Sequence, residues 1–180
     1  MALQNVFTGK TASITLSTSG TLPEQADANA VLATSFGDTN PVVGRATGIR
    51  VMVQTDLEEF HEIGHRHPIV LHPGDIHISG SIDRAYLSGA MLMLLLGRRG
   101  SPDNQPPTYP QPAFTLNVFL QDPAVPTQGS TMVLDGVKLQ NWGFTMPEDD
   151  FVMENVTFKA LTISVLDFDT GNRLIPQFPN

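Results

Sequence analysis

The run His61-Glu62-Ile63-Gly64-His65 has the spacing that comes closest to a known chemistry. On a helix, two histidines four positions apart share one face and bind zinc, and the glutamate beside the first acts on the zinc-bound water. Here, however, Gly64 weakens a helix and Pro68 stops one three residues after His65. We therefore interpret the run as a bent strand with polar side chains, and keep a zinc-dependent metallohydrolase using His61, Glu62 and His65 as the alternative.

Other clusters of titratable residues offer less chemistry. All five histidines fall between residues 59 and 79, where they could make a contact between subunits sensitive to pH. Glu148, Asp149 and Asp150 could hold a cation, but three acids in a turn are more often solvated. Arg98 and Arg99 are interpreted as solvated loop residues. Because the sequence has no Walker loop, dinucleotide fingerprint or nucleophile elbow, we expect no enzyme activity and no cofactor.

Composition limits the function further. The chain has 180 residues and 41% hydrophobic side chains, which suits a single domain over residues 1–180. A formal net charge of −8 with three lysines leaves no basic patch for gripping phosphates. The absence of cysteine excludes disulfides. The N-terminus shows no secretory signal, and the longest apolar stretch, residues 90–96, is too short to span a bilayer. We expect a protein made in the cytoplasm, with no membrane contact.

Alternating patterns predict strands over residues 11–18, 48–56, 74–82 and 114–120, and residues 58–72 are expected to continue the sheet after a bend. Residues 24–32 are compatible with a short helix. Apolar residues three and four apart predict a helix over residues 84–96, with Asp83 as N-cap and Gly97 as C-cap. Five prolines make residues 98–112 an extended loop suited to contacts with partners. Extended arms are expected at both termini.

The last third of the chain predicts a long antiparallel hairpin. One arm covers residues 135–145, an acidic turn covers residues 146–150, and the second arm covers residues 151–166. Trp142 and Phe144 lie on one apolar face, in the core or between subunits. Strands this long leave sheet edges that must be covered or paired with another chain. The expected fold is mainly β (α+β), with packed antiparallel sheets forming a sandwich or partly open barrel and one flanking helix.

The segment from Gly136 to Ile163, including Asn141-Trp142-Gly143-Phe144 and Pro147-Glu148-Asp149-Asp150-Phe151-Val152, resembles tail tube proteins of contractile-tailed bacteriophages. The strand over residues 74–82 followed by a helix is also similar to that family. The resemblance covers roughly residues 45–166. It also implies a relation to tubes of contractile injection systems and of type VI secretion.

The resemblance implies a virion structural protein that assembles into stacked hexameric rings, forming a hollow conduit for DNA delivery inside a contractile sheath. The implied partners are further copies of the chain, the tail sheath, the baseplate and the tail terminator. Tape measure protein and DNA would pass through the lumen without specific binding, and an acidic lumen would repel phosphate. A baseplate tube initiator or tail terminator is the alternative within this class. Candidate positions at subunit contacts or the lumen are Trp142, Phe144, Glu148, Asp149, Asp150, Arg98 and Arg99.

Overall fold

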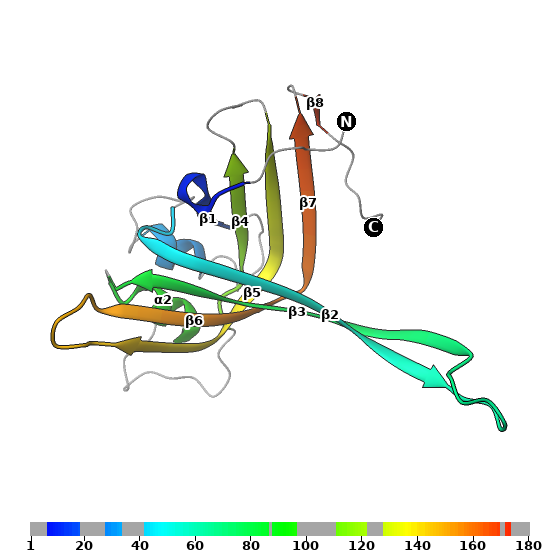
Figure 1. The fold of residues 1–180 in the computed structure, drawn as a ribbon. Helices are drawn as coiled ribbons and strands as arrows, with labels where there is room; N and C mark the ends of the chain where they lie inside the picture. Colours follow the sequence, from blue (N-terminus) through cyan, green and yellow to red (C-terminus); the bar gives the residue numbers. More distant parts are fainter. Residues whose placement is uncertain are drawn as a thin grey trace.

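Within the described residues, eight antiparallel strands dominate the fold of the computed structural model (Figure 1). The structure describes residues 7–18, 28–33, 42–86, 88–96, 111–121, 128–169 and 172–173. In chain order, the elements are the 3₁₀ turn η1 (Gly9–Thr11), β1 (Ser13–Ser17), β2 (Ala46–Phe60), β3 (Val70–Ala85), α2 (Ala90–Leu96), β4 (Phe114–Gln121), β5 (Gly129–Thr145), β6 (Met153–Ala160), β7 (Thr162–Asp169) and β8 (Asn172–Arg173). Residues 28–33 form a further short helix, which overlaps the segment expected to allow one.

The sheet divides into two layers because β5 belongs to both. Its first half, Gly129–Asp135, pairs with β4 on one side and β7 on the other. Its second half, from Lys138 to Thr145, pairs with β6. We call β1, β4, the first half of β5, β7 and β8 the short layer, and β2, β3, β6 and the second half of β5 the long layer. The mainly β, partly open barrel predicted from the sequence is confirmed by this curled sheet.

Gly136 marks the point where β5 passes from one layer to the other. Its φ is +62°, a left-handed conformation that residues with a Cβ rarely adopt. A Cβ at this position would also come within 2.5 Å of the Leu161 side chain. Leu161 itself lies between β6 and β7, and its N–H donates to the Asp135 carbonyl. The bend in β5 is therefore matched by the break between β6 and β7.

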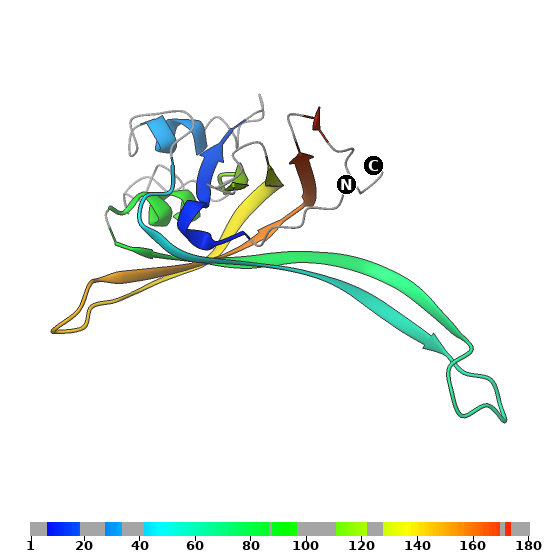
Figure 2. The same ribbon diagram turned by 45° about the horizontal axis from the view of Figure 1, so that its top comes forward.

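The hydrophobic core lies where the two layers and the helices face one another (Figure 2). Strand alternation supplies it from the long layer, where Ile82, Val156 and Phe158 are fully buried. The short layer adds Leu116 and Leu134. The remaining buried apolar residues include Leu16, Leu32, Met91, Leu94, Val137 and Leu139. No helix in the described part of the chain is long and apolar enough to cross a membrane.

Two predicted elements need correction. The helix expected over residues 84–96 begins only at Ala90, since β3 continues to Ala85 and pairs with β6 through Arg84 and Glu154. Asp83 is a strand residue and not an N-cap, and its carboxylate accepts a 2.6 Å hydrogen bond from Asn155 Nδ2. The burial of the Arg84–Glu154 ion pair explains why β3 extends to Ala85. Apolar periodicity in the sequence does not indicate such a buried ion pair. Gly97 lies outside the described residues.

The second correction concerns the hairpins. The arm predicted over residues 151–166 is two strands, β6 and β7, which separate at Leu161 and pair with different halves of β5. The longest hairpin is instead formed by β2 and β3, of 15 and 16 residues. The segment 58–72 belongs to this hairpin and contains its turn. Most of the proline-rich loop, including Arg98 and Arg99, lies outside the described residues, as do the chain ends.

Candidate assembly surface

The β2–β3 hairpin extends far beyond the body of the molecule (Figures 1 and 2). Pairing between β3 and β6 ends at Ile78, so residues 54–77, which we call the arm, have no third strand beside them in the described part of the chain. The eight residues from Val70 to His77 alone span roughly 26 Å at the usual rise of a strand. Because isolated two-stranded ribbons are marginally stable in water, such an arm indicates a surface made for a partner.

The exposed side chains of the arm support that interpretation. Leu57, Phe60 and Ile76 are each more than half exposed, and Ile63 at the tip is fully exposed. Further exposed apolar residues on the arm are Ile69, Val70 and Leu71. Apolar side chains gathered on a narrow projection are typical of a surface that is buried on association.

The arm also contains the zinc-protease spacing, and it does not place the histidines on a helix. His61, Glu62 and His65 lie in the turn over residues 61–69, which we call the arm tip. The His65 N–H donates to the Glu62 carbonyl over 3.1 Å, and His61 Nε2 lies 3.2 Å from Glu59 Oε2. Among the described residues, no three His, Asp or Glu side chains are grouped closely enough to hold a metal ion. The geometry that the hydrolase interpretation requires is therefore not formed.

The long layer has two edges that no described strand covers. Strand β2 is the last strand of the sheet, and the second half of β5 pairs with β6 on one side only. In order across the layer, β2, β3, β6 and β5 alternate in direction, so the two outer strands run antiparallel to each other. An edge of this length exposes a row of N–H and C=O groups that can pair with another chain.

The two faces of the long layer differ. One carries the core residues and is covered by the short layer and α2. No described element covers the other, which we call the bare face and which curves concavely along its length (Figure 2). Arg50, Met52, Ser79, Ser81 and Thr157 line one hollow on the bare face. The charged residues on this face have both signs: by strand alternation they include Arg50, Asp56, Asp83, Lys138 and Lys159. An acidic lumen would therefore need charges from outside this face.

The end of the layer opposite the arm holds most of the other candidate residues. Glu148, Asp149 and Asp150 are exposed in the turn between β5 and β6, as the sequence predicts. Met146 and Phe151, which flank these acids, are 71% and 79% exposed. We call residues 146–151 the acidic turn.

The predicted aromatic face lies beside the acidic turn. The Trp142 ring is half-buried, and its Nε1 donates a 2.9 Å hydrogen bond to Glu154 Oε2. Phe144 is more than half exposed, and its ring centroid lies 5.3 Å from that of Trp142 and 6.2 Å from that of Tyr86. Trp142 therefore supports the core, while Phe144 is exposed to solvent in the single chain.

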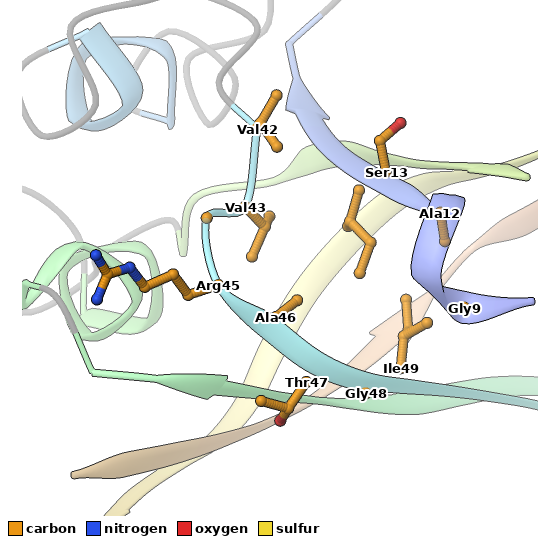
Figure 3. A pocket seen from close by; sticks show the side chains of 12 residues that line it. Gly9, Ala12, Ser13, Val42, Val43, Arg45, Ala46, Thr47, Gly48 and Ile49 are labelled. Carbon is orange, nitrogen blue, oxygen red and sulfur yellow. The ribbon is translucent and has the colours of Figure 1, made fainter. Parts of the chain in front are cut away.

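A cavity of about 290 Å³ lies between η1, β1 and the start of β2 (Figure 3). Its lining is small and apolar, with Ala12, Val43 and Ile49 among its residues. Arg45 supplies the one charged side chain of the lining, and this side chain points away from the cavity. The cavity thus lacks the converging polar groups of a catalytic site.

A curled antiparallel sheet with a bare concave face and a long projecting hairpin defines the tail-tube class of fold. Comparison with solved structures shows this fold directly. The chain matches a chain of the PVC sheath–tube complex of an extracellular contractile injection system, with a TM-score of 0.58, 9% identity, and coverage of 91% of this chain and 93% of that one.

Two further structures agree. A chain of the sheath/tube terminator of the same kind of system gives a TM-score of 0.59 at 10% identity, covering 91% of this chain and 99% of that chain. The SPP1 tail tube gives 0.53 at 8% identity, covering 92% and 82%. No protein-family model matches the sequence, and no curated protein matches it either. At these identities the likeness establishes the shared fold, and with it the fold expected from the resemblance.

The arm is the feature that sequence reasoning missed. An available signal was the pair of β-rich runs over residues 49–60 and 70–82, which flank the turn-forming Gly64 and Pro68. It was obscured because a strand pair without a core shows no burial alternation.

Proposed function

We propose that this chain is a non-enzymatic structural subunit of a tail tube, in which copies close into rings and rings stack into a hollow conduit for DNA. The observation that carries the proposal is the pair of open, oppositely placed edges on the long layer. Joining β2 of one copy to the second half of β5 of the next continues the antiparallel alternation without interruption. Repetition of one head-to-tail contact closes a ring.

The size of such a ring suits a conduit. Six copies of a four-stranded layer, with strands about 4.8 Å apart, give a circumference of roughly 115 Å and a diameter near 37 Å before strand tilt widens it. Side chains on the inside reduce this width but leave room for a nucleic-acid duplex. The bare concave face would line the lumen, and its small polar side chains, such as Ser79, Ser81 and Thr157, favour sliding over binding.

The proposed setting is the tail of a virion or a related injection particle. The short layer and α2 would face outward toward a contractile sheath, and the ends of the tube would meet a baseplate and a terminator. Tape measure protein and DNA would occupy the lumen. A terminator or a baseplate tube initiator is the second candidate, because the same fold occurs in a sheath/tube terminator structure and in an anti-feeding prophage baseplate structure.

Electron microscopy of the purified protein tests the proposal. A tube subunit should give rings and, at high concentration, long tubes with a continuous lumen, whereas a terminator or initiator should stop at one ring or a short stack. A protein that stays monomeric at high concentration would contradict both assignments.

Proline substitutions on β2 test the edge contact itself. Successive N–H groups of a strand point to opposite edges, so of Met52→Pro and Val53→Pro one removes a donor from the open edge and the other removes a donor to β3. The variant that loses the open-edge donor should remain folded, with a melting temperature close to wild type, and should fail to form rings. The variant that loses the donor to β3 should be less stable. Normal rings from the stable variant would show that β2 does not pair with β5 of the next copy.

A further inference from the structure

The two ends of the long layer carry complementary surfaces. The arm tip holds Arg66 and three histidines, His61, His65 and His67, against a single carboxylate, Glu62. Its apolar Ile63 is fully exposed. This tip offers several N–H donors and positive charge around one projecting apolar side chain.

The acidic turn has the opposite character. Glu148, Asp149 and Asp150 are exposed and follow one another in sequence, and the apolar side chains of Met146 and Phe151 stand on either side of them. One of the six carboxylate oxygens is already engaged, since Asp150 Oδ1 accepts the Phe151 N–H over 2.7 Å. The others face solvent in the isolated chain, with Glu148 and Asp149 making no side-chain bond within the described residues.

These two surfaces do not meet within one molecule. The pairing register places the acidic turn next to Ala85 and Met153, whereas the arm tip follows Phe60, at the far end of β2. Figure 2 shows the two hairpin ends on opposite sides of the body. A surface and its complement at opposite ends of one molecule form the arrangement that makes head-to-tail contacts between identical copies.

We propose that the arm tip of one copy docks on the acidic turn of a copy in the neighbouring ring, and that this contact sets the direction and register of stacking. Ile63 packs between Met146 and Phe151, while His65, Arg66 and His67 bind the carboxylates of Glu148 and Asp149. This inference rests on the proposed tube function and adds the identity of the stacking contact. The ring contact along β2 and β5 is separate from it.

A pair of charge-reversed variants gives the sharpest test. The tip variant carries His65→Glu and Arg66→Glu, and the turn variant carries Glu148→Lys and Asp149→Lys, with Asp150 kept because it binds the Phe151 N–H. Each variant alone brings like charges together at the stacking contact and should give single rings without tubes. Mixing the two should restore tubes, because each tip then meets a turn of opposite charge.

A matched control places negative charge on the strands of the arm, outside the arm tip. The variant Gln54→Glu with His72→Glu changes two exposed strand positions outside the tip. It should form tubes like the wild type.

The tubes restored in the mixture should dissociate in high salt more readily than tubes held together by an apolar contact would.

Cross-linking supplies a second readout that does not depend on tube formation. The chain lacks cysteine, so Ile63→Cys with Phe151→Cys creates the only two thiols. A disulfide needs Cα atoms within about 7 Å, which the two ends of one molecule cannot provide. Oxidation of assembled protein should therefore yield covalent ladders of two or more chains, and a control with Leu161→Cys in place of Phe151→Cys should not.

The outcomes separate this inference from the function on which it rests. Tubes formed by either variant alone, or ladders absent from wild-type-like tubes, would overturn the docking contact and leave the tube function standing. A wild-type protein that forms no rings would overturn the tube function itself. Rings from each variant, tubes from the mixture and ladders from the cysteine pair together support the contact.

Discussion

Gly136 lies where β5 passes from one layer of the sheet to the other, in a left-handed conformation. Replacement by alanine places a Cβ in a left-handed conformation and within 2.5 Å of Leu161 Cδ1. We expect Gly136→Ala to destabilise the fold by about 1–3 kcal/mol, which for a chain of this size lowers Tm by roughly 3–10 °C. Thermal unfolding followed by circular dichroism measures the loss.

A matched control lies in the same strand. Gly143 has no atom within 4 Å of an added Cβ, so Gly143→Ala should leave Tm nearly unchanged. Because Leu161 is exposed, Leu161→Ala added to Gly136→Ala should recover the steric part of the loss. Equal stability of Gly136→Ala and Gly143→Ala would show that the bend tolerates a side chain.

Glu154 holds together the end of the long layer beside the acidic turn. Its carboxylate is buried, accepts a hydrogen bond from Arg84 Nε and accepts another from Trp142 Nε1. Glu154→Gln removes the negative charge from the buried Arg84–Glu154 pair, which we expect to cost about 3–5 kcal/mol. Denaturant unfolding measures this change in the free energy of unfolding. Replacing both partners together, as Arg84→Met with Glu154→Leu, should cost clearly less, and an equal cost would contradict the pairing argument.

Only some of the residues that stabilise the fold could be predicted from the sequence. Strand β6, with its buried Val156 and Phe158, lies within the arm predicted over residues 151–166, because strand alternation is local information. Arg84 and Glu154 are 70 positions apart and make a buried pair that no local pattern announces. The need for glycine at positions 80 and 136 is likewise set by residues distant in sequence, because an added Cβ would come within 2.4 Å of Phe158 at Gly80 and within 2.5 Å of Leu161 at Gly136.

At the scale of elements, the arm should be separable from the body. Thr55 and Ile76 are paired, so residues 56–75 can be replaced by Asn-Gly to give a two-residue hairpin turn. The buried core residues lie outside the removed segment, and the shortened chain should keep its Tm within a few degrees. We expect it to form rings by electron microscopy and no tubes.

Failure of the shortened chain to fold would show that the arm contributes to the stability of the body, and normal tubes would show that stacking does not use the arm.

The arm was hard to predict from the sequence because its side chains are almost all exposed. Strands are recognised in sequence by the contrast between a buried and a solvated face, and residues 54–77 have no such contrast in the isolated chain. The helix expected over residues 84–96 begins six residues later, because Arg84 and Ala85 belong to β3 and pair with β6, which a local helical pattern does not indicate.

At the scale of the whole molecule, all five histidines lie on the arm, so we expect the proposed stacking contact to depend on pH. The arm carries five carboxylates and Arg66, a net charge of −4 with neutral histidines and +1 with all five protonated. Histidines generally change charge between pH 8 and 5, while carboxylates stay ionised above about pH 5.5. Positive charge at the tip then increases as pH falls, opposite the carboxylates of the acidic turn.

We therefore expect tubes to be more stable at pH 6 than at pH 8, with rings changing little. The charged groups around these histidines include Glu59 beside His61 and Asp56 beside His77, both of which already pair within the arm. Among the described residues of the tip, His65 and His67 have no carboxylate within ion-pair distance, so they are the tip histidines available to a carboxylate of another copy. Sedimentation of assembled protein between pH 5.5 and 8 measures the effect, and His65→Gln with His67→Gln should flatten the profile. A steep profile that survives this double substitution would place the pH response elsewhere in the molecule.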